Sequence, residues 1–328
     1  MMNGDEGMAR QRYSNIDPTA TTKTWKEVRR WQKERKGKVK DLTFRIGQAE
    51  HKQQELLRQN HSDVTITWIG HSTFLLQMAG LTIVTDPVWA TRMGFNARLE
   101  APGLAMEEIP PVDVILLSHS HYDHLHVGSL KKLKGSPVVL VPEGLGAKVR
   151  KMKLGTVYEL SWWGSQTVGA VEFHFVPAQH WTRRTLTDTN TSLWGGWVIR
   201  RRTESISEGE QDRNTIYFAG DSGYFEGFRE IGKRFSDIRY ALMPIGAYEP
   251  EWFMGMQHVT PEEAVQAFLD VGGQLFIPMH YGAFRLADDT PKEALDRLLA
   301  DWQRRGLNPS FLRLLKHGET LVAERTGE

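Results

Sequence analysis

The chain has 328 residues, of which 40% are hydrophobic and 25% are charged, and its formal net charge is +1. This composition is typical of a globular protein with a sizeable core, and no apolar run is long enough to cross a bilayer. The absence of cysteine excludes disulfides, thiolate metal sites and a cysteine nucleophile. The first residues contain no apolar secretory signal, so we expect a cytoplasmic protein.

The first element along the chain is a basic segment at residues 20–40, which holds nine Lys or Arg residues against two Glu residues. Its sequence TTKTWKEVRRWQKERKGK predicts a helix with Trp25, Val28 and Trp31 on one narrow stripe. Two interpretations are open. A basic amphipathic helix can rest on an anionic membrane, or its tryptophans can dock on the rest of the protein. We treat residues 1–60 as a basic N-terminal arm.

Residues 61–328 have the pattern of one domain, in which many strands are separated by helices. Residues 64–87 predict two or three strands that are broken near residues 70–71 and 79–80. A continuous apolar run, VDVILLS at 112–118, is typical of a strand covered on both faces. Further strands are predicted at 138–142, 156–160, 171–177, 193–200, 214–219, 240–245 and 274–280, helices at 261–271 and 291–305, and an exposed hairpin loop at 202–214. This order favours an α/β sandwich over a barrel.

A cluster of histidines follows the apolar run, in the sequence LLSHSHYDHLH. His119, His121, Asp123 and His124 form an HxHxDH pattern as this strand ends. The first two histidines can point the same way in an extended chain, and the next two ligands follow where the chain turns. Imidazole and carboxylate suit zinc, manganese or iron. A histidine-rich surface loop is the alternative, but the fusion to a buried strand argues against it. The segment therefore predicts ligands for two adjacent metals.

One segment cannot supply all the ligands of two metals, so further ligands are expected at other strand ends. His180 follows VEFHFVPAQ, Asp221 follows TIYFAG, and His280 follows QLFIPM. A single histidine at a strand end is more often structural than a ligand. Three suitable residues at three separate strand ends make coincidence a weaker explanation.

The order HxHxDH, His, Asp, His resembles the metallo-β-lactamase superfamily, and a closer resemblance is to its N-acylphosphatidylethanolamine phospholipase D branch. The closer resemblance rests on QHWTRRTLTDTN, GAYEPEWFMGMQHVTPEEA, FAGDSGYFEGFREIGKRF and other stretches between residues 64 and 319. HxHxDH alone identifies only the superfamily. The resemblance implies an αββα sandwich with a binuclear metal site, and the N-terminal region matches poorly. Residues 61–328 would then be a metallo-β-lactamase-fold hydrolase domain.

The resemblance also implies how the ligands are shared. One zinc would be held by His119, His121 and His180, the second by Asp123, His124 and His280, and Asp221 would bridge both. Two metal ions that share a ligand in this way lower the pKa of a water molecule between them. The water then becomes a hydroxide nucleophile near pH 7. We therefore expect a two-zinc phosphodiesterase that converts N-acylphosphatidylethanolamine to N-acylethanolamine and phosphatidic acid, with manganese or iron as the less favoured metals.

Five other residues are candidates for supporting roles. His258, before a helix opened by Thr-Pro, is predicted to act in catalysis on the substrate side, together with Asp123 and Asp221. Asp86 is expected to hydrogen-bond a ligand histidine, although an aspartate before a proline also forms turns. Substrate-binding or supporting roles are also assigned to Tyr122, His71 and Tyr248, each of which could instead be a packing residue.

The expected partners are a phospholipid substrate and, peripherally, a membrane, without nucleic acid; a homodimer is left open. The main alternative is another hydrolase of the same fold, lactonase-like or nuclease-like, that acts on a soluble phosphorylated substrate. A nuclease should carry more basic segments than the one at residues 20–40. A non-enzymatic lipid-binding protein is less consistent with a complete ligand set.

Overall fold

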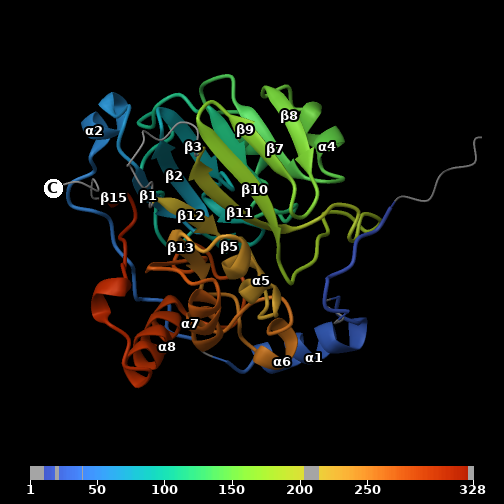
Figure 1. Cartoon of the computed structure of the whole chain (residues 1–328). Coiled ribbons are helices and arrows are strands. Elements are labelled where there is room, and N and C mark those ends of the chain that lie inside the picture. Colours follow the sequence, from blue (N-terminus) through green and yellow to red (C-terminus); the bar gives the residue numbers. More distant parts are fainter. Residues whose placement is uncertain (1–10, 19–21, 39, 203–213, 324–328) are drawn as a thin grey trace, which may run out of the picture.

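Two β-sheets packed face to face make up the centre of the structure, a computed structural model that describes residues 11–18, 22–38, 40–202 and 214–323 (Figure 1). The first sheet has the strand order β15 (Thr320–Val322), β1 (Thr65–Gly70), β2 (Thr73–Met78), β3 (Leu81–Thr85), β6 (Val114–Leu116), β7 (Val138–Pro142) and β8 (Thr156–Leu160). The second has the order β14 (Leu275–Met279), β13 (Ile238–Pro244), β12 (Thr215–Phe218), β11 (Gly195–Arg201), β10 (Val171–Pro177) and β9 (Ser165–Val168). A small hairpin joins β4 (Arg92–Met93) to β5 (Asn96–Ala97).

The helices lie outside the sheets. They are α1 (Trp25–Arg35), α2 (Gln54–Gln59), α3 (Val127–Leu130), α4 (Gly146–Arg150), α5 (Gly227–Arg234), α6 (Glu251–Met254), α7 (Pro261–Asp270) and α8 (Pro291–Arg304), and a 3₁₀ turn spans Pro309–Phe311. Helices α7 and α8 both begin with a capping box and a proline in the first turn, which satisfies their free backbone N–H groups. No helix of the described residues is long and apolar enough to span a membrane.

The alternation of side chains explains why the first sheet is buried on both faces. Within β6, Val114 and Leu116 point into the core between the sheets, whereas Ile115 points to the outer face. That outer face packs against Leu130 of α3 and Val149 of α4. The apolar run at 112–118 therefore belongs to a covered strand, as predicted.

The predicted strands and helices agree with the structure to within a few residues, and the α/β sandwich is confirmed. The predicted turns near residues 70–71 and 79–80 separate strands β1, β2 and β3. The short elements β4, β5, β9, β15 and helices α2 to α6 were not predicted. Helix α5 was missed although it buries Phe228 and Ile231 at helical spacing. The predicted hairpin loop at 202–214 lies almost entirely outside the described residues.

The basic helix α1 packs on α6 and on the loop before α8 (Figure 1). Trp31 stacks on Phe253 with ring centroids 5.0 Å apart, and its indole N–H donates to Asp288 at 3.0 Å. Asp288 is fully buried and also pairs with Arg35 at 3.1 Å. Trp25, in contrast, is 79% exposed. One of the two tryptophans on the predicted stripe is therefore a packing residue, and the other faces solvent.

Candidate metal centre

Four of the predicted ligands lie in the turn that follows β6. Leu125 donates its backbone N–H to the carbonyl of His121 at 2.9 Å, which closes the turn and brings Asp123 and His124 back beside the first two histidines. Nε2 of His119 is 2.9 Å from Nδ1 of His121. The irregular backbone of this segment allows neighbouring side chains to face one point, which a continued strand would not do.

The remaining three predicted ligands come from the second sheet. His180, Asp221 and His280 follow β10, β12 and β14, which run in the same direction, so their carboxyl ends lie at one edge. At this edge Nε2 of His180 is 3.2 Å from Nδ1 of His121, across the two sheets. Nε2 of His280 is 3.2 Å from Oδ1 of Asp221. All seven side chains therefore converge on one centre.

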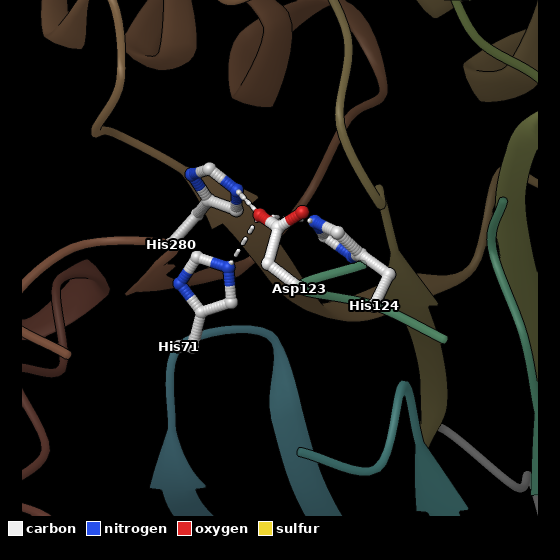
Figure 2. A group of neighbouring side chains, drawn as sticks. All are labelled: His71, Asp123, His124 and His280. Carbon is white, nitrogen blue, oxygen red and sulfur yellow. Dashed lines mark hydrogen bonds and ion pairs between the residues drawn. The ribbon is translucent and has the colours of Figure 1, made fainter. Parts of the chain in front are cut away.

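The bridging position of Asp221 is visible in its distances. Its Oδ2 is 3.9 Å from Nε2 of both His119 and His180, and 3.1 Å from Nε2 of His124. This carboxylate thus lies between a three-histidine group and a second group of His71, Asp123, His124 and His280, drawn in Figure 2. The ligand atoms within each group lie within 4.8 Å of one another. A carboxylate in this position could contact a metal ion held by either group.

Unpaired polar atoms in the cluster supply a test of that fit. Nε2 of His280, Oδ1 of Asp221 and Nε2 of His124 are buried and close to each other, yet among the described residues they lack an aligned hydrogen-bond partner. Buried polar atoms are almost always satisfied in folded proteins, and a bound cation satisfies nitrogen and oxygen lone pairs together. The residues present therefore fit a metal-binding site.

The electrostatics of the cluster are also consistent with a metal-binding site. Burial lowers the pKa of His121 to about 3 and that of His180 to about 4, so both imidazoles are neutral and can act as ligands. Against the same burial, the charge of Asp221 raises the pKa of His280 to about 9. Without a metal, the carboxylates therefore keep a proton on the histidines nearest them, and metal binding would release it.

Hydrogen bonds to the far ring nitrogens fix which histidine atoms face the centre. His124 donates Nδ1–H to Oδ2 of Asp86 at 2.7 Å, and His180 donates Nδ1–H to the carbonyl of Gln257 at 2.8 Å. Asp86 also accepts the backbone N–H of Ser118 at 2.7 Å and its hydroxyl at 2.5 Å. These partners occupy Nδ1 of each ring and leave Nε2 directed inward as the atom that can coordinate a metal. The structure thus pairs Asp86 with the histidine side chain, as the sequence led us to expect.

The other supporting candidates fall in different places. Nε2 of His71 is 3.0 Å from Oδ2 of Asp123, so His71 lies inside the cluster (Figure 2). Nδ1 of His258 is 3.9 Å from Oδ2 of Asp221 and has no hydrogen-bond partner in the part of the chain that the structure describes. Tyr122 is 53% exposed on the surface beside the metal motif.

Tyr248 is not part of this centre. It is 1% exposed, and the guanidinium of Arg297 covers its ring at 4.7 Å. The neighbouring residues of the stretch YEPEWFM also pack inward: Phe253 contacts Trp31, and Met254 lies in the same cluster. A substrate-binding role for Tyr248 therefore has no support in its surroundings.

Sequence reasoning missed Arg184, which braces the metal motif. Its guanidinium donates to the carbonyls of Ser120 at 2.7 Å and Leu125 at 2.9 Å, and it stacks over the ring of Tyr122 at 3.9 Å. A cavity of about 620 Å³ lies beside this contact, with Ser120, Arg184 and Lys148 in its wall. The arginine lies in the stretch QHWTRRTLTDTN, whose length without apolar periodicity was the available signal for a functional loop.

In comparison with known proteins, residues 82–281 match the model of the beta-lactamase superfamily domain. An uncharacterised protein of Mycobacterium tuberculosis is 37% identical over 257 residues, 75% of this chain and 66% of that protein, so the chain spans just under two thirds of that relative. The N-acyl-phosphatidylethanolamine-hydrolyzing phospholipase D 1 of Caenorhabditis elegans is 34% identical over 262 residues, covering 73% of this chain and 71% of that protein. Among solved structures, Igni18, a metallo hydrolase from Ignicoccus hospitalis, has the same fold, with a TM-score of 0.60 and 20% identity over 80% of this chain and 99% of that one.

Proposed function

Since this chain belongs to the beta-lactamase superfamily and is a metal-dependent hydrolase of that fold, we propose that it is a two-metal phosphodiesterase acting on a phospholipid. The proposed reaction converts N-acylphosphatidylethanolamine to N-acylethanolamine and phosphatidic acid. The observation that carries the proposal is the position of Asp221 between two separate groups of ligands. The similarity to a worm phospholipase D named for this substrate supports the choice of lipid.

The ligand atoms support a division into two sites. His119, His121 and His180 would hold one metal ion, Asp123, His124 and His280 would hold the other, and Asp221 would contact both. A nitrogen-rich set with two carboxylates suits zinc, ahead of manganese or iron. When bound, the two ions would act as Lewis acids on the phosphate and lower the pKa of a water molecule.

The chain's own residues would orient the substrate and the ligands. His71 donates its Nε2–H to Oδ2 of Asp123 at 3.0 Å and so fixes the direction of that carboxylate. His258 is buried, and its Nδ1 has no partner within the described residues, so it is free to hydrogen-bond an oxygen of the substrate. Burial keeps the pKa of His258 well below its ordinary value, which makes it neutral at pH 7 and able to donate one N–H.

Contact with lipid would come from the exposed face of α1. Trp25 is 79% exposed, and Lys26 and Arg29 are exposed without an ion pair among the described residues. A tryptophan beside two cations suits the interface of an anionic membrane. The partner we propose is therefore a phospholipid surface, contacted peripherally from the cytoplasmic side.

The deciding experiment combines metal analysis with a substrate panel. Protein purified without chelator should contain two metal ions per chain and should release phosphatidic acid from vesicles containing N-acylphosphatidylethanolamine. His258→Ala should keep both metals and lower kcat, whereas His174→Ala, on β10 away from the cluster, should change neither. Hydrolysis of soluble phosphate esters or lactones alone would replace the lipid with a soluble substrate. One metal ion or none in active protein would rule out the two-metal mechanism.

A further inference from the structure

Residues 11–16, which we call the N-terminal strap, lie across the loop that follows the ligand His180. The backbone N–H of Tyr13 donates to the carbonyl of Asn190 at 2.8 Å. Arg12 donates to two more carbonyls of the same loop, those of Thr187 and Thr189. The strap is thus bound to the loop by several hydrogen bonds, although the two are far apart in the sequence.

Asn15 in this strap reaches the ligand directly. Its side-chain oxygen accepts the backbone N–H of His180 at 3.1 Å and the indole N–H of Trp194 at 2.8 Å. Trp194 also donates to the carbonyl of Ala178 at 3.0 Å, so its indole keeps a partner if Asn15 is replaced. His180 itself is fully buried, so water does not compete for its N–H. Asn15 therefore supplies a direct, shielded hydrogen bond to the backbone of the proposed ligand.

The position of His180 depends on such side-chain bonds because the ladder of its strand has ended. Strand β10 stops at Pro177, and beyond it an isolated bridge pairs Gln179 with Gly223, so His180 lies just past the paired backbone. Its ring is held at one end by the carbonyl of Gln257 at 2.8 Å, which directs Nε2 towards His121. Asn15 and Gln257 hold the backbone and the ring, respectively. Two points of attachment fix a side chain where one leaves it free to rotate.

We propose that Asn15 is a positioning residue for the metal ligand His180, and that the N-terminal strap is a working part of the metal centre. The proposal rests on the proposed role of His180 as a ligand. Residues that orient a ligand typically change metal affinity by about 10- to 100-fold when they are replaced. We therefore expect zinc binding to the three-histidine group to depend on a residue that lies 165 positions away in the sequence.

The test compares Asn15→Leu, which has a similar size but no acceptor, with Asn15→Asp, which keeps one. The neighbouring Ser14→Ala is a matched control on the exposed side of the strap. Zinc affinity is measured on the full chain by competition with a chromogenic chelator. Asn15→Leu should weaken the binding of one zinc ion by roughly 10- to 100-fold. Asn15→Asp and Ser14→Ala should bind both ions as the parent does.

Backbone hydrogen exchange of the metal-free protein gives the second measurement. In Asn15→Leu the amide of His180 should exchange faster, while amides in β1 and β2 keep their protection. Unchanged zinc affinity in Asn15→Leu would overturn the proposal, as would equal losses in the Leu and Asp variants. Faster exchange throughout the protein would assign Asn15 to general stability and also overturn it. Absence of zinc binding in the parent would instead refute the proposed function.

Discussion

Replacing Asp86 with asparagine should weaken metal binding while the fold stays intact. The backbone at Asp86 has φ of +33°, a region that asparagine adopts more readily than most residues. An asparagine oxygen can still accept the N–H of Ser118, now at 2.7 Å from Oδ1. The amide nitrogen, however, replaces the oxygen that accepts Nδ1–H of His124 at 2.7 Å. The NH2 group of the new asparagine would then face the Nδ1–H group of His124, and both groups are hydrogen-bond donors.

His124 can relieve this clash only by moving its proton to Nε2, the atom that lies 3.1 Å from Asp221 and faces the metal centre. A protonated Nε2 cannot coordinate a metal. Losing the carboxylate that orients a ligand histidine typically costs 10- to 100-fold in metal affinity. This corresponds to about 1.4–2.7 kcal/mol of binding free energy.

Zinc titration against a chelator measures this change, with kcat on a soluble phosphodiester as the second readout. Asp113→Asn is the matched control, because Asp113 accepts the backbone N–H of Thr82 at 2.8 Å and forms no hydrogen bond with a histidine of the described residues. Both variants lose a carboxylate, but only Asp86→Asn should lose zinc. Parent-like zinc affinity in Asp86→Asn would refute the tautomer argument.

Three further outcomes follow from contacts described above. Asp221→Asn should lose metal and activity together, because a neutral amide is a poor bridge between two cations; elemental analysis checks this, and full metal content would contradict it. Lys26→Gln with Arg29→Gln should weaken binding to anionic vesicles at low salt by about 1 kcal/mol for each charge removed, and turnover of a soluble phosphodiester should stay the same. Trp31→Ala should lower stability by about 2–4 kcal/mol through the lost ring stacking on Phe253 and the lost indole hydrogen bond to Asp288, measured by thermal unfolding. A stability equal to that of the parent would show that α1 is only loosely attached.

The sequence predicted the metal cluster well because its chemistry is local to strand ends. His180, Asp221 and His280 each follow an apolar strand, and the parallel direction of these strands brings them to one edge. The pairing of Asp86 with His124 could be predicted for the same reason. Asp86 directly follows β3, and the neighbouring parallel strand β6 leads into the metal motif.

Other contacts had no local signal. Tyr248 looked like a substrate contact, but an aromatic residue in a loop can turn to either side, and tertiary packing turned it inward. The docking of Trp31 depends on Asp288, which is 257 positions away. Asn15 reaches His180 from a segment without periodicity or motif. Pairings of this kind are set by the whole fold and not by neighbouring residues.

The edge of the first sheet has a consequence for synthesis of the protein. Strand β15 completes this sheet by pairing with β1, and the hydroxyls of Thr67 and Thr320 meet at 2.8 Å across 253 positions of the chain. A ribosome that adds about 5–20 residues per second needs roughly 13–50 s to cover that distance. During this time one side of β1 has no partner strand, and an open strand edge attracts other chains. The nascent protein should therefore be most prone to aggregation, and most dependent on chaperones, until its last strand leaves the ribosome.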